Sequence, residues 1–220
     1  MTAFIFTIMQ ITLKQLAPVF LEKEKLQQSE IWNTDISFNK GEKIQLVAPS
    51  GSGKTSFVHF LYGMRKDYTG VVLFNDQAIG NWNAEQIAGF RSNNLSIVFQ
   101  DLRLFTEHTA QENISIKRAL NPFGQDRIKE MAERLGIATK LHQNAGICSY
   151  GERQRIAIIR ALQQPFDFIV LDEPFSHLDE ANSKKALTLI EEEATKRGAG
   201  ILLADLEPVP FYKADRTIHL

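Results

Sequence analysis

A loop rich in glycine, serine and lysine occupies residues 48–56, where the sequence reads APSGSGKTS. Glycines allow successive backbone N–H groups to turn toward one anion, and a helix that follows adds its positive end. Lys54 is expected to reach the β and γ phosphates and Thr55 to bind Mg²⁺. The full set of expected nucleotide ligands in the loop is Pro49, Ser50, Gly51, Ser52, Gly53, Lys54, Thr55 and Ser56. The loop predicts a nucleoside triphosphate site, although Ala48 replaces the first glycine of GxxxxGK[ST].

Two adjacent carboxylates follow an apolar run in FIVLDEP, residues 168–174. Ligands of α/β folds bind at the carboxyl ends of parallel strands, so we expect Asp172 and Glu173 to lie beside the phosphate loop. Asp172 is suited to hold Mg²⁺ through water. Glu173 is suited to orient or deprotonate an attacking water. The alternative is that the pair only caps the next turn, and the loop upstream favours the catalytic interpretation.

A third feature with chemical potential is CSYGERQRIAIIRAL, residues 148–162. Ser149 and Glu152 fit the S-x-x-E capping box, which by itself explains the start of a helix. That box requires neither Gly151 nor the basic residues that follow it. A serine hydroxyl and a glycine amide at a helix start also favour anion binding. A structural cap and a second phosphate site are therefore both open interpretations.

The segments around these motifs alternate between strand and helix patterns. Short apolar runs at 43–48, 70–76, 95–100, 168–172 and 199–205 predict strands, and TIHL at the end predicts another. Helical patterns follow at 55–64, 126–137 and 183–198. Parallel strands that alternate with helices predict an α/β fold, here with a P-loop NTPase core.

The first forty residues predict antiparallel β-structure instead. Residues 4–8 alternate between apolar and smaller or polar side chains, and residues 32–39 place Trp32 and Phe38 on one apolar face. We expect these strands to form an antiparallel side layer, and residues 101–147 to form a helical insertion subdomain. The whole chain, residues 1–220, is expected to be a single nucleotide-binding domain.

Bulk composition narrows the class of protein. Lys+Arg 25 against Asp+Glu 26 gives a net charge of −1, so no nucleic-acid partner is expected. The single cysteine, Cys148, permits no intrachain disulfide and fits a reducing compartment. The apolar N-terminal run ends at Lys14, whereas a spanning helix needs about 20 apolar residues. That run also lacks the basic start and the cleavage site of a signal peptide.

Five pieces occur in a fixed order: APSGSGKT, VFQD, CSYGERQR, FIVLDEP and SHLD. In this order they resemble the ATP-binding cassette (ABC) family of transport ATPases over nearly the whole chain. SIVFQDLRLFTEHTAQENI and GERQRIAIIRAL look most like the lipoprotein-release, macrolide-exporter and cell-division group. The resemblance implies a RecA-like core, with ATP and Mg²⁺ as ligands. It also implies a second cassette subunit, identical or different, and an integral membrane permease that holds the protein at the cytoplasmic face of the membrane.

The resemblance also implies roles for single residues. Gln100 would lie at the lid, where it senses Mg²⁺ and the γ-phosphate as a catalytic and metal-binding residue. Ser149, Gly151 and Glu152 would close over the ATP held by the opposite subunit. Asp179 would lie at the dimer interface.

Phe20 stands where cassettes usually carry an aromatic residue that stacks on adenine. Ordinary packing in the core or at an edge explains a phenylalanine at this position equally well. The sequence does not decide between the two interpretations.

The chain departs from the family pattern at two positions. Tyr150 replaces a glycine at the helix start, so either this half-site is weakened or the ring points away. Asp205 stands where cassettes place a histidine against the γ-phosphate, and Ala204 or Leu206 in that position would also lack an imidazole. A carboxylate there repels the γ-phosphate unless it is protonated or turned aside. We therefore expect firm MgATP binding with slow hydrolysis, or dependence on a partner's intact site.

Two further functions compete with a transport ATPase. One is a non-transport switch, an ATP-gated dimer that regulates an envelope complex, which the departures at Tyr150 and Asp205 favour. The other is a GTPase or a small-molecule kinase, which the absence of an Asn-Lys-x-Asp motif disfavours. The VFQD stretch favours transport.

Overall fold

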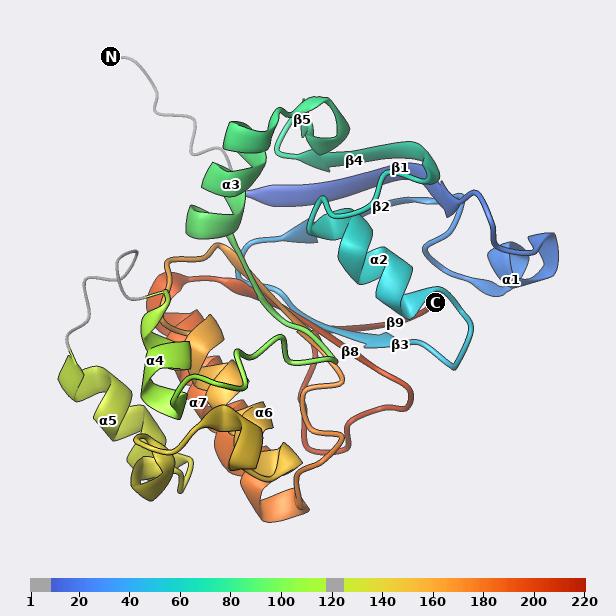
Figure 1. The fold of residues 1–220 in the computed structure, drawn as a ribbon. Coiled ribbons are helices and arrows are strands. Elements are labelled where there is room, and N and C mark those ends of the chain that lie inside the picture. Colours follow the sequence, from blue (N-terminus) through green and yellow to red (C-terminus); the bar gives the residue numbers. More distant parts are fainter. Residues whose placement is uncertain (1–8, 118–124) are drawn as a thin grey trace, which may run out of the picture.

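The computed structural model of the chain describes residues 9–117 and 125–220, which form two β-sheets and the helices around them (Figure 1). The strand predicted for residues 4–8 lies outside the described residues. One sheet is parallel and the other is antiparallel. The predicted α/β class with an antiparallel side layer is thereby confirmed.

The parallel sheet forms the centre of the molecule, with strand order β6-β7-β8-β3-β9. Its strands are β3 (Lys43–Val47), β6 (Leu95–Val98), β7 (Phe168–Asp172), β8 (Gly200–Asp205) and β9 (Arg216–His219). Register pairs Val47 with Asp205 and Asp172 with Ala204. The carboxyl ends of β3, β7 and β8 therefore meet at one edge of the sheet, where α/β folds bind ligands.

The antiparallel sheet has the order β2-β1-β4-β5. Its strands are β1 (Gln10–Pro18), β2 (Asp35–Asn39), β4 (Tyr68–Phe74) and β5 (Gln77–Ala78). Trp32 was predicted inside the second strand, and this placement is wrong. Asn33 has a φ of 57°, which breaks an extended strand, so β2 begins only at Asp35.

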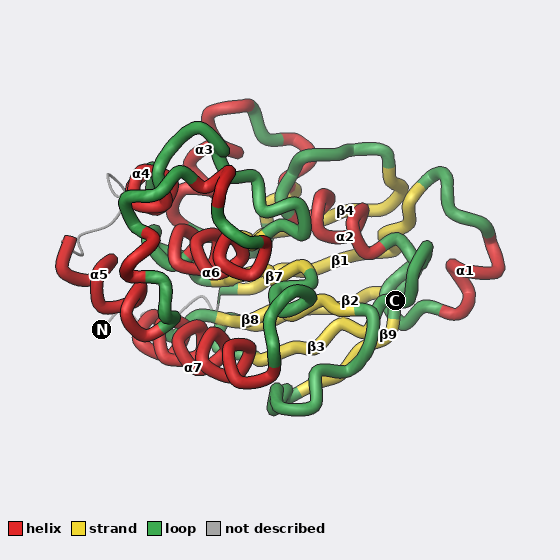
Figure 2. Tube along the Cα trace, turned by 60° about the horizontal axis from the view of Figure 1, so that its bottom comes forward, coloured by secondary structure: helices red, strands yellow, loops and turns green. Residues whose placement is uncertain are grey.

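Helices cover both faces of the parallel sheet, and Figure 2 shows α6 and α7 running beside its strands. The α-helices of the described residues are α1 (Lys23–Gln28), α2 (Lys54–Leu61), α3 (Ala84–Asn93), α4 (Ala110–Ser115), α5 (Gln125–Arg134), α6 (Tyr150–Ala161) and α7 (Glu180–Arg197). Alternate residues of β7 face opposite sides: Ile169 and Leu171 pack in one hydrophobic cluster with α6 and α7, and Phe168 and Val170 in another with α2.

The segment at residues 101–147 is less helical than its sequence suggests. It contains α4 and α5, and two short 3-10 turns at Ala138–Lys140 and Ala145–Ile147. Residues 101–109 form no helix, because Leu102 and Arg103 have φ values of 59° and 48°. Two helices, α1 and α3, were not predicted. The start of α3 was readable, because Asn83 and Gln86 form a complete capping box.

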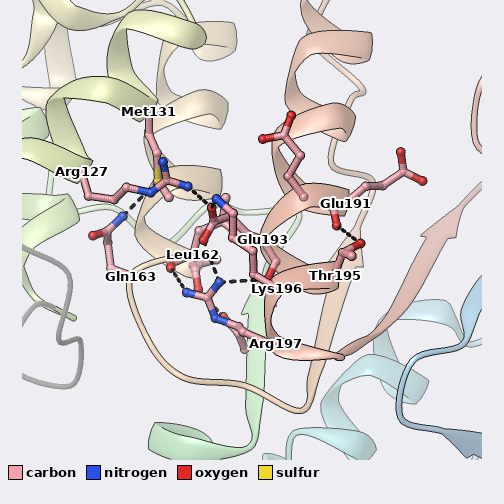
Figure 3. A network of polar contacts seen from close by, with 12 residues as sticks. Arg127, Met131, Leu162, Gln163, Glu191, Glu193, Thr195, Lys196 and Arg197 are labelled. Carbon is pink, nitrogen blue, oxygen red and sulfur yellow. Dashed lines mark hydrogen bonds and ion pairs between the residues drawn. The ribbon is translucent and has the colours of Figure 1, made fainter.

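A buried ionic network joins α5 to α7 (Figure 3). Glu193 on α7 is only 1% exposed and pairs with Arg127 of α5. Arg197 and Lys196 lie 2.7 and 2.9 Å from the same carboxylate. Burial raises the pKa of Glu193, but the three cations outweigh it and hold the pKa below its ordinary value. The network therefore anchors α5 to the sheet-covering helix α7 while Glu193 stays ionised.

Candidate nucleotide-binding site

The phosphate loop connects β3 to α2 at the edge where the parallel strands end. Gly51 and Gly53 have φ values of 78° and 100°, a region that residues with a Cβ rarely occupy. Gly53 is the residue immediately before the helix, so these two glycines allow the loop to curl over the N-terminus of α2. The predicted loop geometry is therefore present, and Ala48, the departure from the motif, is fully buried behind it.

Trp32 supports this loop from below. Its indole N–H donates to the carbonyl of Ser52 at 3.0 Å, and a Cβ on Gly53 would come within 3.1 Å of its ring. The Ser52 hydroxyl is buried and has no hydrogen-bond partner among the described residues. An unpaired buried hydroxyl in a loop of inward-facing amides fits a phosphate oxygen that would accept from it. Sequence reasoning missed the role of Trp32, because it placed this residue in a strand and did not predict the turn at Asn33.

Lys54 is buried and lies between the two carboxylates after β7. Its ammonium is 2.6 Å from Asp172 and 2.6 Å from Glu173. Burial alone would lower the pKa of Lys54, but the hydrogen bonds that its ammonium donates to both carboxylates hold its pKa above the ordinary value. Burial raises the pKa of Asp172, and the ammonium opposes that rise. The predicted proximity of the phosphate loop to this acid pair is thus observed.

Glu173 has a strained backbone, with a φ of 48°. Non-glycine residues hold such a conformation only where their surroundings impose it, and such residues cluster at functional sites. Gln154 on α6 is 1% exposed and donates to the carbonyl of Glu173 at 3.0 Å. Its amide oxygen accepts from the backbone N–H of His177 at 3.2 Å. Sequence reasoning missed Gln154, because it lies between Arg153 and Arg155 and nothing in the sequence separates it from these polar neighbours.

A cavity of about 300 Å³ opens over the loop. It is lined by Phe20, Leu21, Pro49, Ser50, Gly51, Gly53, Lys54, Thr55, Ser56, Gln100, Glu173 and Leu206. A volume of this order lies at the lower end of the range for ligand pockets. The cavity gathers residues from five separate parts of the chain around one cationic, glycine-rich floor.

Phe20 lies at the rim of this cavity and is 52% exposed. It therefore does not pack in the core, which removes one alternative to a role in stacking. The Arg65 guanidinium lies 4.9 Å from the centroid of its ring, a distance typical of a cation–π contact. Arg65 also donates to Ser56 at 3.3 Å, so it joins the rim to the phosphate loop.

Gln100 follows β6, is exposed and lines the cavity. A neighbouring cavity of about 130 Å³ places it beside Thr55 and Asp172. No group of three or more His, Cys, Asp or Glu suited to a metal occurs in residues 9–117 and 125–220. A Mg²⁺ site here would thus combine Thr55, Gln100 and Asp172 with oxygens of the nucleotide, a hard oxygen set that suits Mg²⁺.

The helix start at Ser149 forms a complete capping box. Its hydroxyl accepts from the Glu152 N–H at 3.2 Å, and the Glu152 carboxylate accepts from the Ser149 N–H at 2.8 Å. Packing within the subunit also explains the glycine at position 151, because a Cβ there would lie 2.8 Å from the carbonyl of His177. Tyr150 turns toward Gln100 and donates to its carbonyl at 3.0 Å. Ser149 itself is exposed, so its hydroxyl edge remains open to a second molecule.

Of the three candidate positions for the missing histidine, Ala204 is buried, and the end of β8 separates the other two. Leu206 lines the cavity over the phosphate loop, whereas Asp205 lines a different cavity with Phe175 and Phe211. The Asp205 carboxylate accepts from the N–H of Leu206 at 2.8 Å. Burial raises the pKa of Asp205, and the nearby charge of Glu173 adds to that rise.

Asp179 caps α7, where its carboxylate accepts from the N–H of Asn182 at 2.8 Å. The side chain is exposed, and the bond to the Asn182 N–H holds its pKa below the ordinary value. Helix capping alone is enough to explain an aspartate at this position. The role of Asp179 at a dimer interface stays a prediction.

A phosphate loop and a carboxylate pair on one edge of a parallel sheet, beside an antiparallel layer, define an ATPase cassette of the P-loop class. The ABC transporter family matches residues 31–176 of the chain. The protein therefore belongs to the ABC transporter family, as the ATPase domain.

Relatives with different named tasks match the chain to a similar degree. The lipoprotein-releasing system ATP-binding protein LolD of Legionella pneumophila (strain Lens) is 30% identical over 190 residues, which cover 84% of each chain. The glucose import ATP-binding protein GlcV of Saccharolobus solfataricus is 30% identical over 95% of this chain and 60% of its own length.

The fold agrees with solved ABC structures. The dimeric structure of the bacterial ABC transporter cassette MJ0796 aligns with a TM-score of 0.75 and 23% identity, over 90% of this chain and 88% of that one.

No helix in residues 9–117 or 125–220 has the length and apolar character needed to span a membrane.

Proposed function

We propose that this chain binds MgATP in the cavity over its phosphate loop, closes with a second cassette around the nucleotide, and uses hydrolysis to drive a separate membrane permease. The observation that carries this proposal is one cavity that joins Phe20, the phosphate loop, Gln100 and Glu173. The base, the phosphates, the metal and the attacking water each have a residue suited to them there.

The chain's own groups divide the work as follows. Lys54 would leave its two carboxylate partners to pair with the β and γ phosphates, and the loop amides would bind the remaining oxygens. Glu173, once freed from Lys54, would accept a proton from the attacking water. Thr55, Gln100 and Asp172 would hold Mg²⁺, which supplies positive charge against the charge that develops on the phosphates.

We further propose that this chain hydrolyses ATP slowly. Neither Asp205 nor Leu206 carries an imidazole that could contact the γ-phosphate, and Leu206 is the residue that lines the nucleotide cavity. An apolar side chain there supplies no hydrogen bond to the transition state. An interaction made only in the transition state changes turnover and leaves binding intact.

The named relatives do not agree on the kind of permease that this chain would drive. LolD proteins are named for lipoprotein release and GlcV for glucose import, and both match this chain at 30% identity. The resemblance in VFQD and GERQR favours a permease of the lipoprotein-release kind over an importer. We place the chain at the cytoplasmic face of the membrane through that permease, with an identical or a different second cassette.

Equilibrium binding and turnover measured on the purified chain test the core of the proposal. We expect ATP to bind more tightly with Mg²⁺ than with EDTA, and Glu173→Gln to abolish the residual turnover while binding persists. A wild type that binds neither ATP nor ADP would refute the proposal.

A non-transport switch is the second candidate, favoured by the side chains at Tyr150 and Leu206. Both functions require ATP binding, so affinity does not separate them. Affinity purification from detergent-solubilised membranes does: co-purification of a protein with several membrane spans indicates transport. Recovery of a soluble or single-span envelope complex instead indicates the switch.

A further inference from the structure

Tyr150, the first residue of α6, joins this helix to two segments that contribute residues to the nucleotide cavity. Its phenol donates to the backbone carbonyl of Gln100 at 3.0 Å. Its ring packs against the imidazole of His177, with 3.9 Å between the centroids, and Arg153 lies 5.0 Å from the ring centroid. The ring also packs against the main hydrophobic cluster. One side chain therefore links α6, the loop after β6 and the turn after β7.

The far end of α6 holds the same loop. Arg160 donates to the carbonyl of Arg103 at 2.7 Å and to the carbonyl of Leu102. Leu102 and Arg103 both have positive φ values, a conformation that persists only under restraint from the surroundings. The loop that begins at Gln100 is thus fixed to α6 at two points, one near each end of the helix.

Gln100 and Thr55 line both the nucleotide cavity and the smaller cavity beside it, and Asp172 lines the smaller one. Within residues 9–117 and 125–220 its amide makes no hydrogen bond, so the side chain is not itself restrained. The hydrogen bond from Tyr150 to the backbone carbonyl of Gln100 therefore restrains the main chain that carries this amide.

We propose that Tyr150 is a positioning residue for Mg²⁺-dependent nucleotide binding: by holding the Gln100 carbonyl, its hydroxyl keeps the main chain in a place from which the Gln100 amide can reach a metal beside Thr55 and Asp172. This inference rests on the proposed function, because it assigns Gln100 to the metal. Tyrosine is needed in this role because glycine at position 150 would leave the Gln100 carbonyl without this donor. The residue that departs from the family pattern thereby has its own task within the subunit.

Tyr150→Phe tests this directly, because it removes the hydroxyl and keeps the ring, its contact with His177 and its packing. Calorimetric titration with the non-hydrolysable analogue AMP-PNP gives the dissociation constant in Mg²⁺ and in EDTA. A neutral hydrogen bond corresponds to about a 2- to 10-fold loss of affinity. We expect that loss in Mg²⁺ only, with the EDTA value unchanged.

Two controls sharpen the result. Tyr212→Phe removes a buried hydroxyl that has no partner among the described residues, so neither dissociation constant should change. Gln100→Ala should lose the Mg²⁺-dependent gain, and adding Tyr150→Phe to it should cost nothing more, because the two residues act in series.

Three outcomes would overturn the inference. Tyr150→Phe could retain the full gain from Mg²⁺, could lose affinity equally in EDTA, or could add its loss to that of Gln100→Ala. A wild type that binds AMP-PNP in neither buffer contradicts the proposed function itself. That result is distinct from all three outcomes, each of which requires a wild type that binds.

Discussion

The residues proposed to bind and hydrolyse ATP form two halves that differ in how closely they follow the family pattern. One half consists of the phosphate loop with Lys54 and the acid pair, all at the buried ends of β3 and β7. The other half consists of the helix start at Ser149 and the end of β8, where Tyr150, Asp205 and Leu206 stand at positions that depart. We therefore expect changes in the second half to alter turnover while the phosphate loop and the proposed base of the first half are kept.

Glu173→Gln should produce the largest effect, since it removes the proposed base from the half that follows the pattern. Loss of general base catalysis lowers turnover by about 10²- to 10⁴-fold. ATP affinity should remain or improve, because one negative charge near the phosphates is gone. Steady-state ATPase assays and calorimetry check both parts. Glu207→Gln, an exposed carboxylate just past β8, is the matched control and should change neither.

Lys54→Ala should weaken ATP binding, whereas Glu173→Gln should preserve it. A charge-assisted hydrogen bond contributes about 1.5–3 kcal/mol, which corresponds to about a 10- to 150-fold loss of ATP affinity. Adenosine should lose none of its weaker binding, because it carries no phosphate. Calorimetric titration with ATP and with adenosine checks this, and an equal loss for both would contradict the assigned role.

A histidine introduced at the end of β8 should raise turnover, because it supplies the imidazole that the family pattern places there. Leu206→His places an imidazole in the nucleotide cavity, whereas Asp205→His places it toward the neighbouring cavity. One added hydrogen bond to the transition state corresponds to a gain in turnover of about 2- to 10-fold. We expect that gain for Leu206→His and a smaller one for Asp205→His. The reverse order, in a kcat measurement at saturating MgATP, would show that Asp205 occupies the position of the missing histidine.

Phe20→Ala should weaken ATP and ADP binding alike, because the adenine is common to both. Aromatic pairs contribute about 0.5–1.5 kcal/mol, or about a 2- to 12-fold loss of affinity. Phe105→Ala is the matched control: this ring is 56% exposed and does not line the cavity. A loss confined to ATP would argue against contact with the base.

Asp205→Asn should give the smallest effect, a change in stability with pH. Burial raises the pKa of Asp205 in the folded protein, so the folded state binds this proton more tightly than the unfolded state. The wild type therefore loses stability as the pH rises from the ordinary aspartate pKa through the raised one. The asparagine side chain does not titrate, so the variant should melt higher at neutral pH and equally in acid, with about 2–4 °C for each kcal/mol gained. Thermal melts at several pH values check this.

The sequence predicted those parts of the site that depend on local backbone pattern. The phosphate loop, the acid pair and the capping box at Ser149 each occupy one continuous stretch, so their geometry follows from residue types at fixed spacing. Gln154, Trp32 and Tyr150 could not be assigned, because their partners lie about 20 to 50 residues away in the chain. The same limit applies to β8, where only the fold shows that Leu206 and Asp205 face different cavities.

The fold divides in the same way. The apolar runs at 43–48, 95–100, 168–172 and 199–205 form strands of the parallel sheet. The run at 70–76 has the same pattern but forms β4 of the antiparallel sheet, because short apolar runs do not reveal which strand is the partner. The turn at Asn33 and the loop at Leu102 were not predicted; both residues have positive φ, and Arg160 of α6 donates to the carbonyl of Leu102 from 58 residues away.

The central claim is that one subunit's phosphate loop and another subunit's helix start enclose the same nucleotide. Sedimentation of Glu173→Gln with and without MgATP tests it, with Ser149→Asp added. Aspartate caps a helix as well as serine does, but its charge repels a γ-phosphate from the facing subunit. Thr109→Asp, at the equivalent cap of α4, is the control. We predict an ATP-dependent dimer that Ser149→Asp abolishes and Thr109→Asp preserves; an undiminished dimer in Ser149→Asp would contradict the claim.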